Sequence, residues 1–204
     1  MNRKLKSRII IASFLATVIA VSVAVSCQFA PENPVPKPNG YFRIDPYAAE
    51  YESFGKTPLD IRINKSATAR ITNTASTKDG SIWFDVTYPK YNATIYCSYV
   101  PVTPATLQKH LQNRMLRVYD NTQYGKPVCI TFEDSVHRIS SHMFMASEKN
   151  VTPLQFISTD STSFVYTGTL FMNGIIRPDS IAPVVDYITD DVVYMLQHLK
   201  NEKR

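Results

Sequence analysis

The stretch LQFISTDSTSFVYTGTLFMN, residues 154–173, shows most directly how this chain folds. Two runs rich in aromatic and β-branched residues, Leu154–Thr159 and Phe164–Met172, flank the polar residues Asp160, Ser161 and Thr162. Such runs favour extended strands, and Asp and Ser side chains stabilise a tight turn by bonding to the local backbone. The stretch therefore predicts a β-hairpin of two antiparallel strands.

Further strands are predicted outside this hairpin. Runs of similar character cover residues 59–63, 69–72, 82–88, 92–100, 128–132 and 138–146. Residues 59–63 alternate apolar and polar side chains, and we expect residues 69–72 to pair with them as a hairpin. Only Pro89–Tyr91 separates 82–88 from 92–100, so we expect these two runs to be neighbours in a sheet.

Two segments have the period of amphipathic helices. Thr103 followed by Pro104 predicts an N-cap and a first helical proline, with the helix continuing to Tyr119. Its apolar stripe consists of Leu107, Leu111, Met115 and Val118. Asp179 and Ser180 predict the cap of a final helix. Its apolar face consists of Ile181, Val184, Val185, Ile188, Val192, Leu196 and Leu199.

Strands followed by a helix, more strands and a last helix indicate the α+β class, with a central antiparallel sheet covered by helices. The order of elements is similar to that of the PsbP-like sandwich, an analogy that carries no function. No internal repeat or second linker interrupts the body of the chain. Residues 41–204 are therefore predicted to form a single domain.

The N-terminal residues are typical of a secretory signal. Four basic residues precede a run of 17 uncharged residues, 9–25. Ala24, Val25, Ser26 and Cys27 resemble a bacterial lipobox, so residues 1–26 are predicted to be a lipoprotein signal peptide and Cys27 the lipid attachment site. An ordinary signal peptide and an uncleaved membrane anchor are the alternatives. Residues 27–40 hold four prolines and predict a semi-rigid tether.

The charge balance argues against a nucleic-acid partner. The chain has 22 basic and 17 acidic residues, and cleavage before Cys27 would leave 18 basic and 17 acidic residues. The positive charge therefore belongs largely to the signal segment, and no nucleic-acid binding is expected. The mature protein would be anchored to a membrane by its N-terminal lipid. It would lie in the cell envelope and face the periplasm or the cell surface.

No pattern in the sequence predicts catalysis, a cofactor or a metal ion. His137 and His142 are five residues apart in a predicted strand region, which places them on opposite faces. Ser135 lacks the glycines of a nucleophile elbow, and no phosphate-binding glycine loop occurs. The adjacent pairs Glu133–Asp134 and Asp190–Asp191 point apart, so we expect them to be solvent-exposed. The protein is not expected to be an enzyme.

Two features remain as candidates for a disulfide and for an interface. Cys97 and Cys129 both lie in predicted strands, and either a bridge between them or buried free thiols fits the sequence. Tyrosine and arginine are enriched at the centres of interfaces, so two aromatic-rich stretches are candidate docking surfaces. The alternative is that these aromatics pack the sheet. The candidate residues are Tyr41, Phe42, Arg43, Tyr88, Tyr91 and Asn92.

Four phrases of the chain closely resemble the gliding-motility lipoprotein GldD family of Bacteroidetes. They are PKPNGYFRIDPYAAEY (36–51), YPKYNATIYCSYVPV (88–102), LQFISTDSTSFVYTGTLFMN (154–173) and DSIAPVVDYITDDVVYMLQHL (179–199). The resemblance spans nearly all of the mature chain. It implies a cell-envelope lipoprotein needed for gliding motility and for the linked type IX secretion machinery, with no established catalytic activity.

The expected function is therefore that of a non-catalytic lipoprotein. We expect it to support the assembly or stability of the gliding and secretion machinery, whose other proteins are its partners. The alternative is a small-ligand-binding module on the periplasmic side or the cell surface, because helix-covered sheets hold pockets between their layers.

Overall fold

The computed structural model describes residue 15 and residues 48–72, 79–122, 124–146, 150–173 and 178–201. The chain divides into two compact units, residues 1–39 and residues 40–204. No helix among the described residues is long and apolar enough to cross a bilayer. The predicted lipid attachment site Cys27, the tether, and the docking candidates Tyr41, Phe42 and Arg43 lie outside the described residues.

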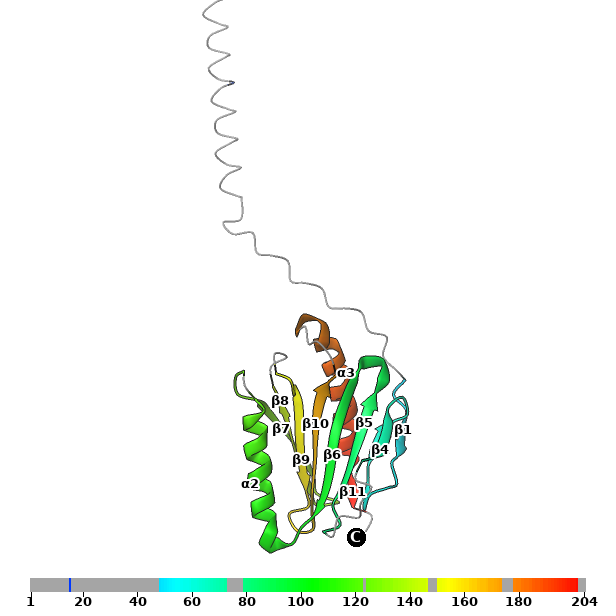
Figure 1. Ribbon diagram of the computed structural model, residues 1–204, viewed down its shortest axis with the longest axis vertical. Helices are drawn as coiled ribbons and strands as arrows, with labels where there is room; N and C mark the ends of the chain where they lie inside the picture. The colour runs from blue at the N-terminus through cyan, green and yellow to red at the C-terminus, as the bar shows by residue number, and fades with distance from the viewer. Residues whose placement is uncertain are drawn as a thin grey trace, which may run out of the picture. The chain divides into compact units, whose positions relative to one another are not determined.

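The second unit is an α+β domain built on a seven-stranded antiparallel sheet with the order β4-β5-β6-β10-β9-β8-β7 (Figure 1). This confirms the predicted fold class. The strands are β4 (Thr68–Ile71), β5 (Ile82–Tyr88), β6 (Ala93–Pro101), β7 (Val128–Asp134), β8 (Ile139–Met145), β9 (Leu154–Thr159) and β10 (Phe164–Met172). Two short ribbons pair β1 (Tyr51–Ser53) with β3 (Arg62–Asn64), and β2 (Leu59–Asp60) with β11 (Lys200–Asn201).

The predicted hairpin is formed by β9 and β10. Its turn depends on Asp160, whose Oδ1 accepts the backbone N–H groups of Thr162 and Ser163 at 3.0 and 2.7 Å. The Ser163 hydroxyl also donates to Asp160 Oδ2 at 2.6 Å. Burial alone would raise the pKa of Asp160, but the bonds from Ser163 and Thr162 outweigh burial and lower this pKa. The turn therefore holds an ionised carboxylate at neutral pH.

The described residues also form a 3-10 turn, Pro89–Tyr91, and two α-helices, α2 (Pro104–Asp120) and α3 (Pro178–Gln197). The start of α2 confirms its prediction, since Thr103 is the N-cap and donates its N–H to Thr106 Oγ1 at 3.0 Å. The start of α3 corrects its prediction. The helix begins at Pro178, so Asp179 and Ser180 lie in its first turn and do not precede it. Proline suits this first position because its φ is already helical.

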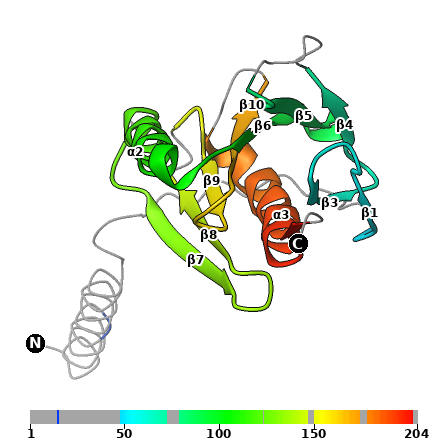
Figure 2. The ribbon, with the colours of Figure 1, turned by 90° about the horizontal axis from the view of Figure 1, so that it is seen from below.

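The two helices cover opposite faces of the sheet (Figures 1 and 2). The apolar stripe of α2 packs against Phe144, Ile157 and Val165, which belong to β8, β9 and β10. The apolar face of α3 packs on the other side, in the main core formed with β5, β6, β9 and β10. On the α2 side, therefore, β5 and β6 are left without a covering helix.

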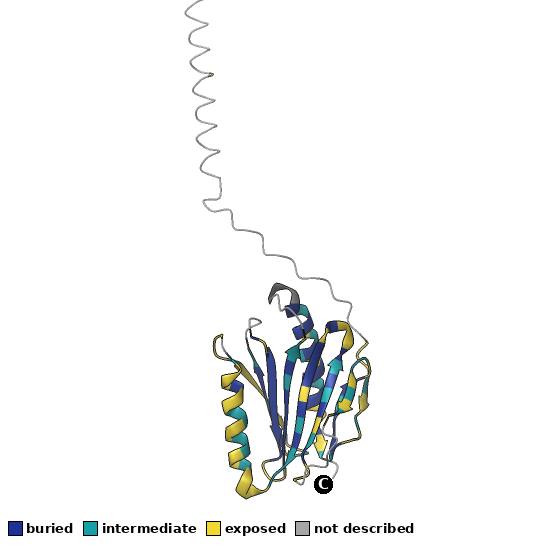
Figure 3. Ribbon diagram, in the orientation of Figure 1, coloured by how far each residue is buried: buried dark blue, intermediate teal, exposed yellow. Residues whose placement is uncertain are grey.

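Figure 3 shows the central strands buried and the outward side of α2 exposed. The edge strand β7 is more exposed to solvent than β8, β9 and β10. Its first four residues, Val128, Cys129, Ile130 and Thr131, are all exposed. This edge of the domain is thus less covered than its centre.

Residues 59–63 form strands as predicted, but the predicted pairing of this segment with residues 69–72 was wrong. The segment is divided at Ile61, and neither half pairs with residues 69–72. β2 pairs with β11 near the C-terminus, β3 pairs with β1, and β4 pairs with β5. The physical reason is that an alternating pattern does not specify which partner a strand takes. The partner of β2 lies near the C-terminus, whereas the partner of β3 lies as near in sequence as the predicted one.

Candidate functional site

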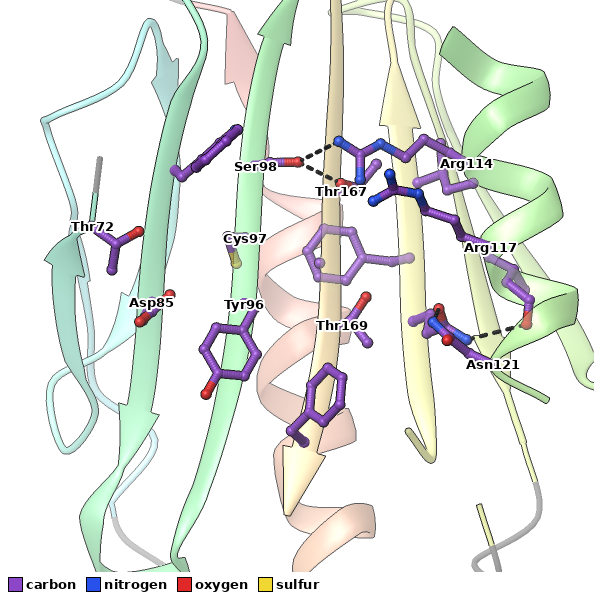
Figure 4. Close-up of a pocket in the computed structure, with 17 residues that line it drawn as sticks. Thr72, Asp85, Tyr96, Cys97, Ser98, Arg114, Arg117, Asn121, Thr167 and Thr169 are labelled. Atoms are coloured by element: carbon purple, nitrogen blue, oxygen red, sulfur yellow. Dashed lines mark hydrogen bonds between the residues drawn. The ribbon is translucent and has the colours of Figure 1, made fainter. Parts of the chain in front are cut away.

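A cavity of about 460 Å³ lies on the α2 side of the sheet, where β5 and β6 have no covering helix. It is lined by residues of β5, β6, β9, β10 and α2, together with Thr72 and Asn121 (Figure 4). Pockets for small ligands typically occupy about 300–1,000 Å³. The cavity is therefore of a size that suits a small molecule.

Strand register produces the floor of this cavity. The cross-strand pairs on the floor are Trp83 with Ser98, Asp85 with Tyr96, Ser98 with Thr167, and Tyr96 with Thr169. Alternate residues of a strand point to the same face, so these side chains share the α2 side. The adjacent strand residues Phe84, Cys97 and Tyr166 point into the main core on the other side. The floor therefore combines hydroxyl groups with large aromatic rings.

Arg114 and Arg117 of α2 form one wall of the cavity (Figure 4). Arg114 Nη2 donates to Ser98 Oγ at 3.1 Å, and the Ser98 and Thr167 hydroxyls are hydrogen-bonded at 2.8 Å. Burial lowers the pKa of Arg114, and the neighbouring positive charge of Arg117 lowers it further. A guanidinium nevertheless stays protonated in proteins. In the described part of the chain, neither arginine forms an ion pair with a carboxylate.

Aromatic side chains form the opposite part of the cavity. Trp83 is 51% exposed and Tyr96 is 47% exposed, so each presents about half of its surface to solvent. Tyr96 meets Phe171 edge to face, with ring centroids 5.3 Å apart. Asp85 of β5 lies opposite Tyr96 and lines the same part of the cavity, and burial raises the pKa of its carboxyl group. The cavity thus has a cationic side and an aromatic side, which together suit an anion that carries a flat or apolar group.

A second polar cluster lies on the α3 side of the sheet, around Asp191. The Tyr51 hydroxyl donates to Asp191 Oδ1 at 2.7 Å, and Asn64 Nδ2 donates to the same oxygen at 3.1 Å. Asn64 Nδ2 also lies 3.3 Å from the Tyr187 hydroxyl oxygen. Burial is the main cause that raises the pKa of Asp191, and the bonds from Tyr51 and Asn64 oppose it. The cluster joins β1 and β3 to α3.

The prediction that Asp191 is solvent-exposed was wrong, because this residue is only 5% exposed. The ribbon of β1 and β3 supplies its partners from more than 100 residues away in sequence. A signal was available in the helical spacing. Asp191 lies three residues after Ile188 and four before Met195, both of which are buried, so it shares their face.

The docking candidates Tyr88 and Tyr91 are also corrected by the structure. Tyr88 is 2% exposed and Tyr91 is 9% exposed, and both belong to the main core. Tyr91 packs edge to face on Tyr187, with ring centroids 5.2 Å apart. Buried rings cannot contact a partner protein. Tyr88 and Tyr91 therefore pack the core of the domain, which was the alternative to a docking surface. Asn92 is exposed at the left-handed position that ends the 3-10 turn, with φ of 49°.

The strand order does not support a disulfide between Cys97 and Cys129. Both are free cysteines, and β10, β9 and β8 lie between their strands. Adjacent strands are about 4.8 Å apart, so about 19 Å separates the two strands, whereas a disulfide requires Cα atoms within about 7 Å. Burial raises the pKa of the Cys97 thiol to about 12. Cys97 therefore stays protonated and unreactive.

The histidine and carboxylate pairs of β7 and β8 do not converge on a site. His137 Nδ1 lies 2.6 Å from Asp134 Oδ2 in the turn after β7, and His142 Nδ1 lies 3.1 Å from Thr131 Oγ1. Backbone and side-chain bonds from His137 lower the pKa of Asp134. Across the described residues, no group of three or more His, Cys, Asp or Glu side chains is arranged to hold a metal ion.

Comparison with known proteins gives one result for function. Residues 31–201 match a family model described as gliding motility lipoprotein GldD. The match covers most of the chain, including the sheet, both helices and the cavity described above. No curated protein gives a significant match to the chain.

Proposed function

The chain belongs to the gliding motility lipoprotein GldD family, and from this membership we propose that it supports the assembly or stability of the gliding and type IX secretion machinery. The family places it in the cell envelope as a membrane-anchored lipoprotein associated with gliding motility. This family is not known for enzyme activity. The match over residues 31–201 is the observation on which the proposal rests.

The proposed mode of action is that of a tethered, rigid body. Cys27 would carry the lipid after cleavage of residues 1–26, and residues 27–40 would act as a semi-rigid spacer between the lipid and the domain. Other proteins of the machinery would then bind the domain. The PsbP-like arrangement of the layers likewise stays a prediction from the order of elements.

The Cys27→Ala variant tests this proposal. Without the acceptor thiol, we expect the protein to leave the membrane fraction and motility and secretion to fall close to the level of a deletion strain. Fractionation of cells, followed by motility and secretion assays, measures both effects. Pull-down from crosslinked cells should recover machinery proteins with the native chain only.

The Cys129→Ala variant is the matched control, because this free cysteine is exposed on β7 in the body of the protein. It should behave as the native chain in every assay. Full motility and secretion with a soluble Cys27→Ala protein would contradict the role of the tether.

The cavity of about 460 Å³ favours a second candidate function, the binding of a small ligand. It would apply if the purified protein retained a small molecule and crosslinked cells gave no protein partner. The chemistry of the lining indicates which kind of molecule to seek.

A further inference from the structure

We propose that the cavity between α2 and strands β5, β6 and β10 binds a small anion, with Arg114 and Arg117 holding its carboxylate or phosphate group (Figure 4). This inference deepens the second candidate function and is independent of the role in the machinery. It rests on the charges, the hydrogen bonds and the aromatic surface that line the cavity.

The first argument is the uncompensated charge of the two arginines. Arg114 and Arg117 lie three residues apart on α2 and are therefore neighbours on one side of the helix. Two like charges in this position repel each other, and the partly buried guanidinium of Arg114 also loses hydration, whereas Arg117 is exposed. Because no carboxylate of the described residues pairs with either of them, an external anion would relieve both costs.

The second argument is the preorganisation of the cationic side. The bond from Arg114 Nη2 to Ser98 Oγ holds this guanidinium over β6, and Thr167 supports Ser98 in turn. The Arg117 side chain has no hydrogen-bond partner among the described residues, so its donors are available. A guanidinium fork matches the geometry of carboxylate and phosphate oxygens, and a fixed fork loses less entropy on binding.

The third argument concerns the rest of the ligand. Trp83 and Tyr96 present half-exposed rings on the same side of the sheet as the arginines. Covering such rings with a flat or apolar group removes apolar surface from water. The volume of about 460 Å³ suits a small molecule better than a folded partner. The ligand class is thus an oxyanion with a small flat or apolar body.

Tryptophan fluorescence gives a direct test, because Trp83 is the only tryptophan of the 204 residues and lines the cavity. Full-length protein in a non-ionic detergent would be titrated with phenyl phosphate, benzoate and benzyl alcohol. We expect phenyl phosphate or benzoate to change the fluorescence in a saturable way that weakens with added salt. Neutral benzyl alcohol should bind at least about tenfold more weakly than the better anion, because it lacks the charge that pairs with the arginines.

Two variants locate the anion. Arg117→Gln should weaken binding by about tenfold or more, and Arg114→Gln should do the same, because each removes a charged donor. Since Arg117 makes no internal hydrogen bond in the described residues, its replacement should leave the thermal unfolding temperature nearly unchanged. Lys109→Gln is the matched control, because it removes a charge from an exposed position of α2 outside the cavity.

A preference for phenyl phosphate or for benzoate would distinguish a phosphate ligand from a carboxylate ligand. The proposal is overturned if neither anion gives a saturable response, or if Lys109→Gln weakens binding as much as Arg117→Gln. Either result would leave the membrane and motility assays of Cys27→Ala unaffected, so failure of this proposal is distinguishable from failure of the proposed function.

Discussion

Replacement of Gly168 by valine is expected to lower the free energy of unfolding by about 3 kcal/mol or more. Gly168 lies in β10, the central strand of the sheet. A Cβ atom here would overlap Cε1 and Cζ of the Phe156 ring and lie 3.1 Å from its Cδ1. That ring is 1% exposed and packs edge to face on Tyr166, with centroids 5.1 Å apart. The ring would have to shift and give up this contact to make room for the new side chain.

Urea denaturation of the purified protein measures this cost, and alanine at the same position should cost roughly 1–3 kcal/mol. A second substitution serves as the control for the mechanism. If the clash with Phe156 is the cause, the double variant Gly168→Ala with Phe156→Leu should lose less stability than the sum of the two single variants, by about 1 kcal/mol. Strictly additive losses would refute this explanation.

Replacement of Asp191 by alanine is expected to lower the free energy of unfolding by about 2–4 kcal/mol. The Tyr51 hydroxyl would lose its acceptor, and Asn64 Nδ2 would lose the nearer of its side-chain partners. A buried donor without a partner costs about 1–3 kcal/mol. Asp190→Ala is the matched control, because the adjacent carboxylate is exposed, and we expect it to change stability by less than about 0.5 kcal/mol. Equal losses for both variants would contradict the role given to Asp191.

The Asp191→Asn variant tests how the contribution of Asp191 to stability depends on pH. Since burial raises the pKa of Asp191, the folded protein binds this proton more tightly than the unfolded chain does. The resulting stability is fully present below the unfolded pKa of about 3.9 and is lost as the pH rises through the raised pKa. An asparagine keeps an acceptor oxygen and has no proton to lose.

The stability of the Asp191→Asn variant relative to the native chain should therefore increase with pH across this window and then become constant. Unfolding free energies over a series of pH values measure the difference. The lowered pKa values of Asp134 and Asp160 affect both proteins equally, so they cancel in this comparison. A difference that does not vary with pH would disprove the raised pKa.

Local chemistry explains the parts of the fold that the sequence predicts. Asp160 holds the turn of the β9–β10 hairpin, Pro89–Tyr91 joins β5 to β6, and Thr103 with Pro104 starts α2. In each case the residues that determine the structure are adjacent in sequence. The pairing of residues 59–63 was not predicted, because an alternating pattern does not encode the choice of partner. One partner, β1, is near in sequence, and the other, β11, lies close to the C-terminus.

The candidate site is harder to predict from sequence, because it depends on which strands become neighbours. Trp83 and Thr167 lie 84 positions apart in sequence, yet both are beside Ser98 in the sheet. In the sequence, Arg114 and Arg117 cannot be distinguished from other polar residues of an amphipathic helix. Their role becomes visible only when the structure shows the uncovered strands beside α2. Asp191 differs, since its spacing from Ile188 and Met195 already marks it as part of a buried face.

Because helices cover the sheet unevenly, the edge strand β7 should open locally more often than the central strand β10. Local openings require less free energy where few apolar contacts must be broken, and this condition holds at β7 and fails at β10. Amide protons of β7 should thus exchange with solvent through fraying of the edge, while those of β10 should await global unfolding. A thiol reagent should therefore reach Cys129 of the edge strand β7 without unfolding, whereas Cys97, buried in β6 beside β10, should react only after unfolding.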